Sequence, residues 1–94
     1  MQARFFIGLL LLAANAGAQT HRIDSIKREL PRLSDGALVN SMNALANEYY
    51  FYWVHADSAL KYTHLAYNKA SQIHYNSGQA EALSIQAGVE GRLL

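Results

Sequence analysis

Hydrophobic residues recur at helical spacing along most of the chain, beginning with a short segment. Ile23, Ile26 and Leu30 stand at i, i+3 and i+7, which predicts an amphipathic helix over residues 22–30. Pro31 is expected to end this helix, because its ring disfavours helical geometry at the residue before it.

A longer helix is predicted over residues 37–54, after the turn residues 34–36. Successive apolar residues on one face of this helix are four, three, four and three positions apart: Leu38, Met42, Leu45, Tyr49 and Tyr52. The run 49–54 is rich in residues that favour strands. It lacks alternation and the chain offers it no partner strand, so we interpret it as the end of the helix.

Two more helices follow. The first is predicted over residues 58–75, capped by Asp57 or Ser58, with a face of small or branched residues: Ala59, Thr63, Ala66, Ala70 and Ile73. Gly78 is expected to end it by taking a positive φ. The last helix begins near Gln79 and is unfinished at Leu94, which leaves its apolar residues without a downstream partner: Leu83, Ile85, Val89, Leu93 and Leu94.

The first eighteen residues have the pattern of a signal peptide. Arg4 is followed by an apolar run over residues 5–14 and then by small residues, which predicts cleavage after Ala18. A buried N-terminal helix is the alternative, but it would be apolar all round and uncapped. A membrane anchor is disfavoured because the run is short and no cysteine follows it. We therefore expect an exported protein, periplasmic or secreted.

Composition narrows the function classes further. The chain has 94 residues and no cysteine, which excludes disulfide scaffolds, thiolate zinc sites and thiol nucleophiles. Its formal charge of +1 predicts no nucleic-acid partner. No run reaches the ~18 apolar residues that a membrane-spanning helix needs.

Candidate chemistry is sparse. The histidines from His55 onward are nine and ten residues apart, which places them on different sides of a helix and predicts no metal site. Neither a Gly-x-Ser-x-Gly elbow nor a glycine-rich phosphate loop is present. We expect no catalytic residues, no cofactor and no enzymatic activity.

Two helical segments resemble each other at an offset of 42 residues. Residues 38–46 and 80–88 both follow a glycine-containing turn and end in similar pairs, Leu45-Ala46 and Ala87-Gly88. This indicates a repeated helical hairpin. A plain three-helix bundle uses the same amphipathic faces and remains the alternative.

The residue runs 30–35, 43–49, 57–62 and 66–70 resemble tetratricopeptide repeats of the ~42-residue kind. They are especially similar to the exported N-terminal repeat arrays of sensor histidine kinases and regulators of Bacteroidota-type bacteria. Departures are Gly91, where the second repeat should carry an aromatic residue, and His55-Ala56 at the turn.

The resemblance implies an all-α fold of antiparallel helical hairpins, of the tetratricopeptide or α-solenoid type, behind a signal peptide. The expected divisions are a signal peptide (1–18), a short helix and linker (19–35), one complete hairpin (36–78) and the first helix of an incomplete repeat (79–94). One hairpin cannot bury its own apolar face. We therefore expect either a fragment of a larger, signal-transducing protein or self-association through the last helix.

A polar ridge is the candidate binding site. Asn40, Asn43 and Asn47 stand at i, i+3 and i+7, off the predicted core face, and Tyr50 continues the ridge. The resemblance implies that such asparagines line a groove that binds an extended peptide. Asn43 stands where a carboxylate-binding lysine would be, which argues against recognition of a terminal carboxylate. The alternative is that the asparagines only solvate an exposed face.

Two functions follow. The first is an exported, non-enzymatic helical-repeat module that binds protein or peptide. The second is a small secreted helical protein that self-associates or lies on a membrane surface. A membrane-surface helix needs more basic residues than Lys61 and Lys69, which favours the first.

Overall fold

The structure is a computed structural model that describes residues 21–51 and 55–93, and within them every regular element is helical. Residues 21–29 form a helix that continues into a 3-10 turn, and three longer helices follow: η1 (Leu30–Arg32), α2 (Asp35–Phe51), α3 (Ala56–Gln72) and α4 (Asn76–Leu93). The expected all-α class is confirmed. The predicted cleavage after Ala18, the aromatic residues 52–54 and Leu94 lie outside the described residues.

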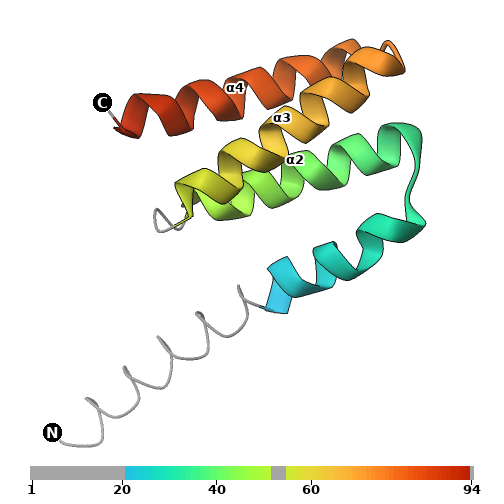
Figure 1. Cartoon of the computed structure of the whole chain (residues 1–94), viewed down its shortest axis with the longest axis horizontal. Coiled ribbons are helices and arrows are strands. Elements are labelled where there is room, and N and C mark those ends of the chain that lie inside the picture. Colours follow the sequence, from blue (N-terminus) through green and yellow to red (C-terminus); the bar gives the residue numbers. More distant parts are fainter. Residues whose placement is uncertain (1–20, 52–54, 94) are drawn as a thin grey trace, which may run out of the picture.

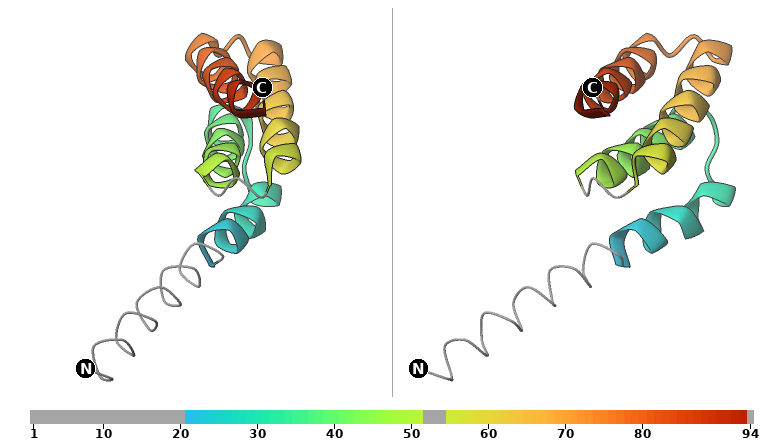
Figure 2. Two further views of the ribbon diagram at one scale, coloured as in Figure 1. Left: turned by 90° about the vertical axis from the view of Figure 1, so that its left-hand side faces the viewer. Right: turned by 60° about the vertical axis from the view of Figure 1, so that its left-hand side comes forward.

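The three long helices pack as successive antiparallel neighbours (Figure 1). In Figure 2, α2 and α4 lie on one side and α3 on the other, and all three helices contact one another. Residues 21–32, called the N-terminal helix below, lie next to α2 on the side away from α4 (Figure 1).

The core is built on the small face of α3. The predicted positions Ala59, Thr63, Ala66 and Ala70 are all fully buried. Small side chains let neighbouring helix axes approach closely. The buried core residues form two clusters, one of Val39, Ala66, Ala70 and Ala82 and the other of Leu45, Tyr49, Ala59 and Val89. Each cluster draws residues from α2, α3 and α4.

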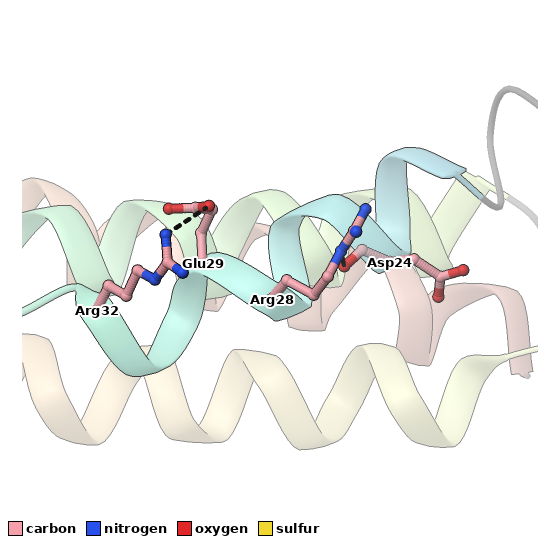
Figure 3. A network of polar contacts seen from close by, with 4 residues as sticks. All are labelled: Asp24, Arg28, Glu29 and Arg32. Atoms are coloured by element: carbon pink, nitrogen blue, oxygen red, sulfur yellow. Dashed lines mark hydrogen bonds and ion pairs between the residues drawn. The ribbon is translucent and has the colours of Figure 1, made fainter.

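The amphipathic pattern of the N-terminal helix is confirmed. Ile23, Ile26 and Leu30 are half-buried and pack against the second cluster. The opposite side is polar (Figure 3): the Arg28 side chain donates to the Asp24 carbonyl at 3.4 Å, and Arg32 pairs with Glu29 at 3.9 Å. This face is exposed and solvated.

The α-helical part of this segment ends at residue 29, before Pro31 as expected, but the helical winding does not stop there. The chain continues as η1 through Arg32, closed by the Leu33 N–H donating to the Leu30 carbonyl at 3.1 Å. Pro31 sits in the first turn of η1, where its missing N–H costs no hydrogen bond.

Neither Asp57 nor Ser58 caps α3. The helix starts earlier, at Ala56, and His55 holds the N-cap position with no side-chain hydrogen bond. The Ala59 N–H donates to the His55 carbonyl at 2.9 Å. Asp57 instead lies in the first turn, where its negative charge interacts favourably with the helix dipole.

The expected role of Gly78 in ending α3 is also wrong. His74 ends the helix with a φ of 58°, and no described glycine takes a positive φ. The Tyr75 N–H donates to the Ala70 carbonyl at 2.8 Å and the His74 N–H to the Ser71 carbonyl at 3.3 Å, which is the hydrogen-bond pattern of a Schellman motif. Gly78 lies inside α4, which begins three residues before the predicted Gln79.

The last helix has two unlike sides. Val89 is 3% exposed and Ile85 is half-buried, so the prediction that these side chains lack a partner is corrected, because both pack in the second cluster. On the outer side of α4, Leu83 remains half exposed and is flanked by exposed Ala80 and Ala87.

Candidate functional site

The four predicted site residues all lie on α2, but the structure separates them. Asn40 and Asn47 are exposed, Tyr50 is half-buried and Asn43 is fully buried. The spacing of the asparagines is helical as predicted, yet α4 packs over the side of α2 that carries Asn43 and Tyr50.

Asn43 joins α2 to α4. Its Nδ2 donates to the Gly78 carbonyl at 3.1 Å, while its Oδ1 has no hydrogen-bond partner in the described part of the chain. A buried polar atom without a partner is costly, so this amide occupies an energetically demanding position. The side chain is not presented at the surface.

Gly78 is what permits this approach. A Cβ at this position would lie 2.7 Å from Cγ1 of Val39 and 3.0 Å from the Tyr75 ring. Contacts under 3 Å are not tolerated without a shift of the neighbouring atoms, so α4 can pack this closely on α2 only because residue 78 lacks a side chain.

Asn40 is held by a hydrogen bond from Tyr75, which lies between α3 and α4. The Tyr75 hydroxyl donates to Asn40 Oδ1 at 2.8 Å. An asparagine amide carries an acceptor oxygen and two N–H donors. Because the hydroxyl engages the oxygen, the bond sets which end of the amide faces Tyr75, and the N–H groups become the main recognition feature of Asn40.

An exposed stripe runs along α2 on the side opposite its buried face. Successive residues turn by 100° on a helix, so positions spaced by four, three and four share one line. The α2 stripe consists of exposed Asn40, Asn47 and Phe51, with half-buried Ala44 between the two asparagines. Phe51 is 60% exposed, the largest exposed fraction among the described large hydrophobic residues.

Sequence reasoning missed Phe51 as a surface residue. Within the aromatic run 49–54, Tyr49 is 6% exposed, whereas Phe51 is 60% exposed. Phe51 lies 200° away from Tyr49 on the helix, which places it in line with Asn47. The helical spacing of Phe51 from Asn40 and Asn47 was the signal that could have placed its side chain at the surface.

Tyr50 links α2 to α4. The Arg92 guanidinium lies 4.2 Å from the centre of the Tyr50 ring, and Arg92 Nη1 donates to the Tyr50 carbonyl at 3.3 Å. The Phe51 ring packs edge-on against Tyr50 at 5.8 Å. Gly88 makes room for the Tyr50 hydroxyl, since a Cβ at position 88 would lie 3.1 Å from the hydroxyl oxygen.

Charged groups hold the other flank of α2. Arg22 pairs with Glu48 at 2.8 Å, which ties the N-terminal helix to α2. Lys27 lies 5.5 Å from the centre of the Tyr49 ring, and the pKa of Lys27 is raised, chiefly by its hydrogen bond with Tyr49. Tyr49 in turn stacks on Tyr62, with ring centres 5.9 Å apart.

Ligands for a metal ion are not gathered in the described residues: no three His, Asp or Glu side chains come together there. The exposed His55 ring packs edge-on against Tyr49, 5.4 Å away. Among the same residues, none of the helices combines the length and hydrophobicity needed to cross a bilayer.

No family model, curated protein or solved structure matches the chain. The support for a function therefore comes from the chain's own geometry, and the most distinctive part of that geometry is the α2 stripe.

Proposed function

We propose that the chain is an exported, non-enzymatic helical-repeat module of tetratricopeptide-like type that binds protein or peptide segments. The observation that carries the proposal is the α2 stripe. It combines two exposed amides, Asn40 and Asn47, with an exposed aromatic ring at Phe51.

The neighbours of the stripe support this proposal. Tyr50 and Arg92 join α2 to α4 on one flank, while Glu48 and Arg22 join it to the N-terminal helix on the other. The stripe therefore lies on a helix fixed from both sides, and a preorganised surface loses less conformational entropy on binding.

Peptide binding can be tested by chemical-shift mapping on the isotopically labelled chain. The probe is a pooled library of acetylated, amidated heptapeptides. We expect shifts confined to α2 residues of the stripe and their flanks. Asn40→Ala combined with Asn47→Ala should remove these shifts, whereas Asn68→Ala, on an exposed position of α3, should not. Shifts spread over α3, or none at all, would refute the proposal.

Self-association is a second candidate, because a specific surface favours it. Leu83 is 50% exposed on the outer side of α4, and a Cβ at the exposed Gly91 would meet nothing within 4 Å. A second copy packed there would cover this face. Sedimentation analysis should then show a dimer that Leu83→Lys dissociates and Leu65→Lys, on α3, leaves intact. A monomer at all concentrations would exclude this candidate.

A further inference from the structure

We infer that the α2 stripe recognises an extended, uncharged peptide segment through two chemically different ends. Asn40, oriented by Tyr75, donates to a backbone carbonyl of the ligand, and Phe51 contacts an apolar side chain. The inference rests on the proposed function and deepens it by naming the ligand chemistry and by making Tyr75 a positioning residue.

The donor end follows from the Tyr75–Asn40 hydrogen bond. Tyr75 is half-buried and packs against the first core cluster, so its ring is held from beneath while its hydroxyl reaches Asn40 Oδ1 at 2.8 Å. The amide is thereby fixed with its nitrogen away from Tyr75. A group that offers N–H donors selects an acceptor, and an extended peptide presents a carbonyl at every residue.

The apolar end follows from the support behind Phe51. Its ring is 60% exposed and rests edge-on against Tyr50. Tyr50 is itself held by Arg92, which lies over its ring at 4.2 Å. An exposed aromatic ring on a fixed neighbour provides apolar surface at little entropic cost, which suits contact with an apolar side chain.

The charge of α2 favours an uncharged ligand. α2 carries two charged side chains, Asp35 in its first turn and Glu48, which pairs with Arg22 at 2.8 Å, and neither belongs to the stripe. No charge on the α2 stripe itself would then compensate a carboxylate or an ammonium group that loses its water. Backbone amides and apolar side chains match the surface.

The distance between the two ends sets the length of the segment. Asn40 and Phe51 are eleven residues apart, so at about 1.5 Å per residue their backbones are roughly 16 Å apart along the helix axis. An extended chain advances about 3.3 Å per residue, which places the apolar side chain about five residues from the bound carbonyl.

The test uses the full chain and a positional-scanning library of acetylated, amidated heptapeptides, with fluorescence anisotropy as the readout. Wild type should prefer apolar residues near one end of the peptide. Phe51→Ala should abolish that preference, while Leu65→Ala, which removes a comparably exposed side chain from α3, should retain it.

The donor end is tested with isosteric variants. Asn40→Asp replaces the donors with acceptors and should weaken binding by at least about tenfold. Tyr75→Phe keeps the ring and removes the hydroxyl, and should weaken binding about threefold to fivefold. Tyr67→Phe, at another half-buried tyrosine, is the matched control and should bind like wild type. The side-chain amide signals of Asn40 should move in Tyr75→Phe without any ligand.

The outcomes separate the two levels of the proposal. If no library member binds, the proposed function fails. If peptides bind on the stripe but Asn40→Asp and Tyr75→Phe bind like wild type, or Phe51→Ala keeps the apolar preference, the inference is overturned and the function stands. Tighter binding of peptides with a free carboxylate would also overturn it.

Discussion

Two glycines of α4 stand in opposite environments, and they allow the close approach of α4 to α2 to be tested at single residues. Gly78→Ala would place a Cβ 2.7 Å from Val39 Cγ1, whereas Gly91→Ala would meet nothing within 4 Å. We expect Gly78→Ala to lower the free energy of unfolding by about 1–3 kcal/mol, because overpacking exceeds the gain in helix propensity.

Gly91→Ala is the matched control for that substitution. It lies on an exposed helical position, so alanine should raise the free energy of unfolding by about 0.5–1 kcal/mol. Urea unfolding of both variants measures the contrast. Equal effects of the two substitutions would mean that α4 does not approach α2 at Gly78 as closely as described.

The left-handed residue that ends α3 offers a stabilising substitution. His74 holds a φ of 58°, which costs a residue with a Cβ about 1–2 kcal/mol. His74→Gly should raise the free energy of unfolding by about 0.5–1 kcal/mol, because the relief of strain outweighs the added flexibility of the unfolded chain. Thermal melts should show His64→Gly, inside α3, to be destabilising, and a loss of stability in His74→Gly would contradict the assignment.

At the scale of helices, the contact between Lys27 and Tyr49 predicts a pH dependence. The pKa of Lys27 is raised above 10.5 in the folded chain, so the folded state binds this proton more tightly than the unfolded state. Its contribution to stability is therefore complete below pH 10.5 and is lost as the pH rises through the folded pKa.

Replacing Lys27 isolates this contribution. The stability difference between wild type and Lys27→Met, measured by urea unfolding, should be constant below pH 10.5 and shrink as the pH rises above it. Lys69→Met, in the last turn of α3, should show a smaller change over the same range. A difference that is constant with pH, or grows, would remove Lys27 from the docking of the N-terminal helix.

The helices were predictable from the sequence because apolar or small residues recur along one face of each. The residues at which the helices end were not predictable. The small face of α3 follows from its spacing, because every member must contact a neighbouring helix. The end of α3 depends on backbone geometry at His74, which no residue pattern announces. Asn43 was assigned to the surface because its spacing does not reveal that α4 packs on that side of α2. The same missing neighbour explains why Val89 was predicted to lack a partner.

For the molecule as a whole, the two core clusters predict the order in which its parts open. Both clusters combine α2, α3 and α4, since one contains Val39, Ala66 and Ala82, and the other contains Leu45, Ala59 and Val89. Disrupting either cluster affects all three helices, so these helices should unfold as one cooperative unit.

The N-terminal helix is attached differently. It contributes half-buried side chains at Ile23, Ile26 and Leu30, together with the Arg22–Glu48 ion pair. Native-state hydrogen exchange should therefore show amides of residues 21–32 opening at lower free energy than those of α2, α3 and α4. Ile26→Ala should speed exchange in the N-terminal helix alone, whereas Val89→Ala should speed it across the three long helices. Equal protection of the N-terminal helix and α3 would show that all four helical segments unfold as one cooperative unit. The N-terminal helix would then be as stably folded as α2 itself.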